Sequence, residues 1–180
     1  KAAAAAMGRS MDDVVIAAFN ASADTDETGS TAVALPSSSK FSTSDQADGL
    51  TIAKLLAAKE FFDGGDVDPS IARYVVCGSK QIQDLLGTTQ VTSADFNTVK
   101  ALASGDIDTF LGFKFILSNR LPMDGTNTTD RLVFAYTADS IKLAVGKDIT
   151  AKIDVRPDKS YATQVYTCMS IGATRMEETK

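Results

Sequence analysis

GDIDTFLGFKFILSNRLP, residues 105–122, is a short turn that leads into an aromatic-rich strand and then into a polar corner. Alternation along the strand predicts that one face carries Phe113, Phe115 and Leu117, and the other Lys114, Ile116 and Ser118. Pro122 has no amide proton to give to a sheet, so it marks the exit from the strand. We therefore expect the strand to end at the Ser118-Asn119-Arg120 corner.

Further elements precede this stretch in a fixed order. Residues 50–62 have the spacing of a helix, Arg73-Tyr74-Val75-Val76-Cys77-Gly78 has the pattern of a strand, and residues 79–86 follow as a short helix that Ser79 can cap. Together with the Ser-Asn-Arg-Leu-Pro run at 118–122, this order resembles the major capsid proteins of tailed bacteriophages. The likeness is best between Arg73 and Pro122 and extends coarsely over the chain.

The resemblance implies an α+β fold with two domains. Residues 26–147 would form an axial domain with helices on a mixed sheet. Residues 1–25, as the end of a central helix, and residues 148–180, as returning strands, would form a peripheral domain of a long helix and antiparallel strands. Because the chain opens on Lys1 inside a helical pattern, we expect a fragment that lacks the family's N-terminal arm and extended loop.

The resemblance also implies a function without chemistry of its own. The chain would be a structural subunit of the virion, not an enzyme, that assembles in the host cytoplasm into an icosahedral shell around double-stranded DNA. Its partners would be copies of itself in pentamers and hexamers, with scaffold and portal proteins, and no cofactor, metal or membrane is expected. The candidate residues for subunit interfaces are Lys114, Asn119 and Arg120, although ordinary solvated charges explain the two cations equally well.

Composition agrees with a shell protein. With 180 residues, 44% of them hydrophobic, the chain can bury a sizeable core, and its net charge of −5 is spread without a basic block. A protein that grips nucleic acid needs clustered cations, so we expect DNA to be enclosed without sequence-specific binding. The longest apolar run, residues 110–117, is interrupted by Lys114 and is too short to cross a bilayer. Cys77 and Cys168 are expected to be buried free thiols.

Catalytic motifs are scarce. The sequence contains no histidine, which excludes Ser-His-Asp and Cys-His arrangements, and it has no phosphate-binding glycine loop. The strongest alternative from a different class is a small metal-dependent hydrolase using Asp63, Asp66 and Asp68, although these residues lack the spacing of a calcium loop. A second alternative keeps the fold and changes the cargo, as in the encapsulin-type shells of bacterial nanocompartments.

Periodicity predicts the remaining elements. A helix ends near Asn20, with an apolar stripe made of Met7, Met11, Val14, Val15, Ala18 and Phe19. Residues 21–48 are expected to form a surface loop with at most one short strand, followed by a helix from about Asp48 that stops at the left-handed Gly64-Gly65 pair; its inward residues are Ile52, Leu55, Leu56 and Phe62. A fourth helix is expected from Ser93 to just before Gly105, and alternation after Pro122 predicts a β-meander.

Overall fold

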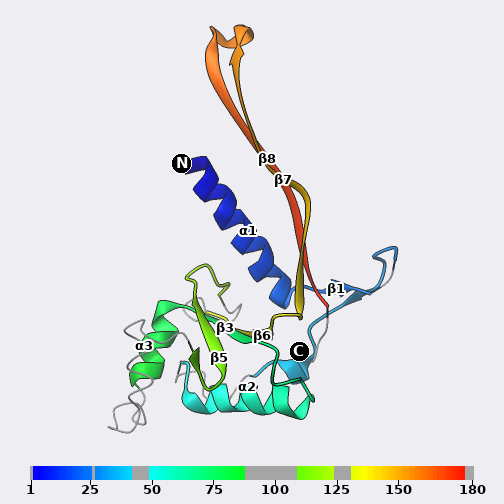
Figure 1. Ribbon diagram of the computed structural model, residues 1–180, viewed down its shortest axis with the longest axis vertical. Coiled ribbons are helices and arrows are strands. Elements are labelled where there is room, and N and C mark those ends of the chain that lie inside the picture. Colours follow the sequence, from blue (N-terminus) through cyan, green and yellow to red (C-terminus); the bar gives the residue numbers. More distant parts are fainter. Residues whose placement is uncertain (1, 26, 42–48, 88–108, 124–130, 177–180) are drawn as a thin grey trace.

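The computed structural model describes residues 2–25, 27–41, 49–87, 109–123 and 131–176. Figure 1 shows two parts: a body made of a four-stranded sheet with helices α2 and α3, and a long two-stranded ribbon beside helix α1. The described helices are α1 (Ala2–Asn20), α2 (Ile52–Gly64) and α3 (Ser79–Gly87), with 3-10 turns η1 (Ser37–Ser39) and η3 (Pro157–Lys159). The strands are β1 (Ala23–Asp24), β2 (Ala32–Val33), β3 (Arg73–Cys77), β4 (Thr109–Phe110), β5 (Phe113–Leu117), β6 (Phe134–Thr137), β7 (Ile141–Arg156) and β8 (Ala162–Arg175).

The sheet of the body is mixed, as predicted. Its strand order is β4-β5-β3-β6, in which β3 runs parallel to β5 and antiparallel to β6. Strands β4 and β5 form a tight antiparallel hairpin through Leu111 and Gly112, whose φ angles are 54° and 86°. Positive φ at both central residues matches the right-handed twist of paired strands, and glycine adopts it without steric cost. This turn places Phe113 at the start of β5.

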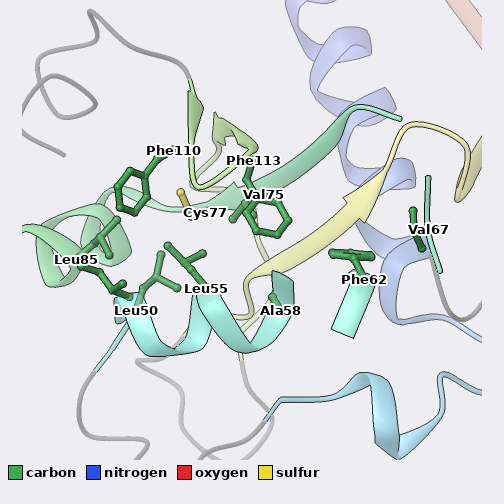
Figure 2. Packing of buried hydrophobic residues seen from close by; sticks show 11 residues of the cluster. Leu50, Leu55, Ala58, Phe62, Val67, Val75, Cys77, Leu85, Phe110 and Phe113 are labelled. Atoms are coloured by element: carbon green, nitrogen blue, oxygen red, sulfur yellow. The ribbon is translucent and has the colours of Figure 1, made fainter. Parts of the chain in front are cut away.

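Helix α2 covers one face of this sheet and builds the main core. Figure 2 shows Leu55 and Phe62 of α2 pointing toward Val75 and Cys77 of β3, with Phe113 of β5 beside them. Val75, Cys77 and Phe113 have no exposed surface, and Leu85 joins them from α3. Burying one such aliphatic or aromatic side chain contributes about 1.5–3 kcal/mol, so this cluster is the main support of the body.

Burial along β5 falls from its first residue to its last. Phe113 is buried and Phe115 is half-buried, but the Leu117 side chain is 60% exposed. Alternation predicted the same face for these three residues. Alternation does not ensure burial, because burial also requires another element over that face. In the described core cluster, Phe113 is the buried residue of β5 and Phe115 packs against the cluster while half-buried.

Helix α2 ends at Gly64 as predicted, but its first residue, the conformation that stops it and one of its faces differ from the prediction. It begins at Ile52 with Thr51 as the N-cap, where the Thr51 hydroxyl accepts a hydrogen bond from the Lys54 amide at 3.4 Å. The expected left-handed glycine stop is wrong, since Gly65 has a φ of −81° and Asp66 takes the positive φ of 56°. Leu56, expected to face inward, is 49% exposed because it lies off the stripe that meets the sheet.

Helix α1 ends at Asn20 as predicted and connects the ribbon to the body. Its buried residues are Ile16, Ala18 and Phe19, so Ile16 was missing from the predicted stripe, whose Met7, Met11, Val14 and Val15 are only half-buried. The Phe19 ring stacks on Phe134 of β6 with centroids 4.9 Å apart and an interplanar angle of 11°. Aromatic contacts of this kind add to area burial, so they attach the end of α1 to the sheet.

Two predictions about connections are wrong. The segment after α1 holds two short strands, β1 and β2, which pair with each other, where at most one was expected. The strands after Pro122 do not form a meander, because β6 pairs with β3, whereas β7 and β8 pair only with each other in the part of the chain that is described. Period-two alternation identifies a strand but not its partner. The helix expected between Ser93 and Gly105 lies outside the described residues.

Candidate functional site

The ribbon has two chemically different faces in its outer half. Ile153 opposes Val165, and the flanking pairs Ala151 with Thr167 and Val155 with Thr163 lie on the same side. Residues directly opposite each other in an antiparallel pair share a face, so these six residues form one surface, named here the outer apolar face. The opposite surface, the outer polar face, consists of Lys152, Asp154, Arg156, Ala162, Gln164 and Tyr166.

The described part of the chain leaves the outer apolar face uncovered. Ile153 is 70% exposed, Val165 61% and Val155 58%. Figure 1 shows the reason, since α1 lies beside the lower part of the ribbon and the outer end projects past it. Large aliphatic side chains that gather on one face of a projecting ribbon indicate an interaction surface.

Strand β8 carries this face continuously from the base of the ribbon to its tip. Both register irregularities insert their extra residues into β7, so the odd-numbered residues of β8 stay on one side. Arg175 at the base is buried, the odd-numbered residues from Ala173 to Thr167 are half-buried, and Val165 and Thr163 are exposed. The outer apolar face therefore continues the surface that the rest of the chain covers near the base.

Arg175 holds the base of the ribbon to its surroundings. Its guanidinium donates hydrogen bonds to the carbonyl oxygens of Ala21 at 2.6 Å and of Phe19 and Val33 at 3.3 Å. Carbonyls at the end of a helix have no partners within the helix, and a cation placed there also meets the negative end of the helix dipole. One side chain thus joins β8, the end of α1 and strand β2.

The candidate interface residues have partners within their own chain. The Arg120 guanidinium makes a two-fold contact with the Asp13 carboxylate of α1, through Nε at 2.6 Å and through Nη2. That hydrogen bond, with the charge of Arg120, lowers the pKa of Asp13 from its ordinary value. The contact joins α1 to the corner after β5. It is exposed, so it contributes little to stability.

Asn119 and Lys114 also contact neighbouring strands or helices. The Asn119 side-chain oxygen accepts hydrogen bonds from the Ser79 amide at 3.0 Å and from its hydroxyl at 3.2 Å. Ser79, predicted as the cap of this helix, is the first residue of α3, and its hydroxyl donates to the Asn119 side chain. The Lys114 ammonium lies 5.9 Å from the centroid of the Tyr74 ring on the paired strand. The three residues therefore bind the chain internally, and a role toward another subunit stays a prediction.

The acidic turn after α2 does not form the metal site of the hydrolase alternative. Asp63 accepts a hydrogen bond from the buried Arg73 at 2.7 Å, and Asp68 accepts one from the Ser70 amide at 2.8 Å, which lowers the pKa of Asp68. Asp66 occupies the left-handed turn position. Among the residues described, no three acidic, cysteine or histidine side chains lie together so that they could hold a metal ion.

The two cysteines are free thiols in different surroundings. Cys77 is fully buried, and desolvation raises the pKa of its thiol to about 11. Cys168 on β8 is only half-buried, so the prediction of burial is wrong for this residue. A hydrogen bond from Lys147 lowers the pKa of the Cys168 thiol. Both cysteines lie in strands, as predicted.

The outer apolar face and Arg175 were not among the predicted functional residues. The alternation of Ile149, Ala151, Ile153 and Val155 with charged residues was visible in the sequence, but it equally describes a strand whose apolar face is covered.

None of the described helices is both apolar enough and long enough to span a membrane.

Comparison with known proteins gives a consistent result. A family model described as phage capsid protein matches residues 1–180. Three solved structures are similar: one named for Mycobacterium phage Che8 (TM-score 0.62, 19% identity), the capsid asymmetric unit of cyanophage Pam1 (0.62, 16%) and the capsid of cyanophage P-SCSP1u (0.57, 18%). They match 99%, 97% and 78% of this chain, respectively. These likenesses confirm the predicted fold. No match is found among curated proteins.

The solved chains are longer than this one. The chain spans 59% of the Mycobacterium phage Che8 chain, 63% of the cyanophage Pam1 chain and 48% of the cyanophage P-SCSP1u chain.

Proposed function

Because the chain belongs to the phage capsid protein family, we propose that it is part of a shell subunit that self-assembles into an icosahedral capsid around double-stranded DNA. The match of the family model over residues 1–180 carries this proposal. The architecture supports it, since a body with a projecting ribbon offers several separate surfaces to neighbouring copies. Each contact in a closed shell can be modest, because many contacts act together.

We propose copies of the same subunit, arranged as pentamers and hexamers, as the main partners. Scaffold and portal proteins are further proposed partners, and assembly would take place in the host cytoplasm. The net charge of −5 without a basic block supports a shell that surrounds DNA without binding a particular sequence. The role is structural and needs no catalytic group.

The proposed division into domains follows the two parts of the molecule. Residues 26–147 would form the axial domain, and residues 1–25 with 148–180 the peripheral domain. The packing of α1 against the ribbon supports this grouping. Strand β7 runs from Ile141 to Arg156, so the ribbon itself begins a few residues before the proposed boundary.

Assembly of the complete protein tests the proposal. Expressed and purified, it should sediment as closed particles that electron microscopy shows to have icosahedral symmetry, and particles from infected cells should contain double-stranded DNA. Particles filled with an enzyme and free of DNA would instead identify a nanocompartment shell. A protein that stays monomeric at all concentrations, with or without scaffold, would contradict the proposed function.

Comparison of Arg120 with Asp13 tests the predicted interface role. If Arg120 acts only on Asp13 within the chain, Arg120→Ala and Asp13→Ala should change the yield of assembled particles equally. We expect Arg120→Ala to reduce the yield more, since an interface cation also loses its partner on the neighbouring subunit. Both variants should unfold within about 1 kcal/mol of the parent protein, because the pair is exposed. Sedimentation of particles is the measurement, and equal yields would restrict Arg120 to its contact with Asp13.

A further inference from the structure

We infer that the outer apolar face of the ribbon docks on a second copy of this chain in the assembled shell. This inference rests on the proposed function and names one surface that serves it. The face is formed by Ile153 and Val165 at its centre, with Ala151, Val155, Thr163 and Thr167 around them.

The first argument is that the face continues a surface that is already an interface. Along β8 the same side of the strand is buried at Arg175, half-buried from Ala173 to Thr167 and exposed at Val165. Helix α1 packs on the ribbon and lies along its lower part, as Figure 1 shows. Past the end of this cover the same side of the ribbon still carries Ile153, Val155 and Val165, and no described residue covers them.

The second argument concerns the stability of the ribbon. An isolated two-stranded hairpin is at best marginally stable in water, and it needs a further strand or a packed layer. Strands β7 and β8 pair only with each other in the described part of the chain, and 14 to 16 residues make each of them long. The outer half therefore requires a partner that packs on its apolar side.

The third argument identifies the class of partner by charge. Lys152, Asp154 and Arg156 alternate in sign along the outer polar face, and the apolar face itself carries no charge. Binding to nucleic acid or to an anionic membrane surface requires clustered cations, which this region lacks. An apolar protein surface is the complementary partner.

The fourth argument selects a second copy by area. Ile153, Val155 and Val165 are each about 60–70% exposed and together offer roughly 200 Å² of apolar surface. A stable protein–protein interface buries about 800 Å² on each partner. A face of this size is too small to hold a separate partner protein alone. It suits one of several repeated contacts between copies in a closed lattice, where multivalency makes weak contacts effective.

Tryptophan fluorescence tests the docking directly, because the sequence contains no tryptophan. In the complete protein, Ile153→Trp places a single reporter on the outer apolar face, and Gln164→Trp places a matched reporter on the outer polar face. On assembly, emission from position 153 should shift to shorter wavelength and become several-fold less accessible to acrylamide. Emission from position 164 should change little.

Each outcome of this measurement decides the inference. If the tryptophan at position 153 still emits at long wavelength and is still quenched by acrylamide in intact particles, the inferred docking is wrong, while the proposed function stands. If this tryptophan already emits at short wavelength and resists acrylamide in the unassembled subunit, the inferred docking is also wrong, since another part of the same chain would then cover the face. Absence of particles from the unsubstituted protein would instead be the failure of the proposed function.

Assembly of charge variants gives an independent test. Val165→Asp puts a carboxylate on the outer apolar face, and Ala162→Asp puts the same charge on the outer polar face, directly opposite Arg156. We expect Val165→Asp to raise the protein concentration needed for assembly about tenfold or more, because burying an unpaired carboxylate costs more than the about 1.4 kcal/mol that a tenfold change represents. Ala162→Asp should assemble like the parent. Val165 is exposed in the single chain, so thermal unfolding of both variants should match the parent and show that folding is intact. Equal assembly of the two variants would contradict the inference.

Discussion

Replacement of Phe113 by alanine is expected to lower the free energy of unfolding of the body by about 3–5 kcal/mol. Phe113 has no exposed surface, and its ring lies 6.0 Å from that of Phe62 on α2. It also faces Val75 and Cys77 in the core shown in Figure 2. Truncation removes the transfer free energy of the ring and leaves a cavity that the surrounding strands cannot close. Urea unfolding followed by circular dichroism measures the loss.

Leu117→Ala is the matched control for this variant. Leu117 lies on the same strand and, by alternation, on the same face, but its side chain is 60% exposed. Its truncation should change the free energy of unfolding by no more than about 0.5 kcal/mol. Equal losses from the two variants would mean that a layer also covers the end of β5 and that the gradient of burial along this strand is wrong.

Replacement of Arg175 by methionine is expected to cost about 2–4 kcal/mol and to loosen the base of the ribbon. Methionine keeps most of the apolar length but removes the guanidinium that donates to Phe19, Ala21 and Val33. The three carbonyl oxygens then lose a charged donor at a buried site, where water cannot easily replace it. The loss should be local to the junction of α1, β2 and β8.

Hydrogen exchange measures this local effect. The Ala21 amide donates to the Ala17 carbonyl at the end of α1, and the Met176 amide donates to Ser140 at the base of the ribbon. Both amides should exchange faster in Arg175→Met, while amides of β3 in the body keep their protection. Arg156→Met is the control, because Arg156 is exposed and contacts only the nearby Asp158 among the hydrogen bonds described for its side chain. Unchanged exchange at Ala21 and Met176 would show that Arg175 does not hold the junction.

Much of the fold could be predicted because local rules act over a few residues. The end of α1 at Asn20 and strand β3 at Arg73–Cys77 follow from apolar spacing and a β-branched run. The order of helix, strand and helix within residues 50–86, followed by the Ser-Asn-Arg-Leu-Pro run at 118–122, was also sufficient for the family resemblance, which the family model confirms. These features depend on side chains that are close in sequence.

The candidate site was less predictable because exposure and strand partners depend on residues far apart in the chain. Arg175 reads as one more cation at the end of an alternating strand until the fold brings it to Ala21, a residue 154 positions away. Asn119 and Arg120 read as a free polar corner until Ser79 and Asp13 meet them. No local pattern contains such contacts.

Sequence alone therefore specified the end of α1, strand β3, helix α3 and strand β5, their order, and the absence of histidine-based chemistry. Only the tertiary structure decided that β6 joins the sheet of the body while β7 and β8 form a separate ribbon. It also decided that, on one side of β8, Val165 is exposed and Arg175 is buried. The physical reason is that hydrophobic periodicity sets the direction of each side chain, whereas its burial is set by the element that packs above it, which the chain supplies from a distant position.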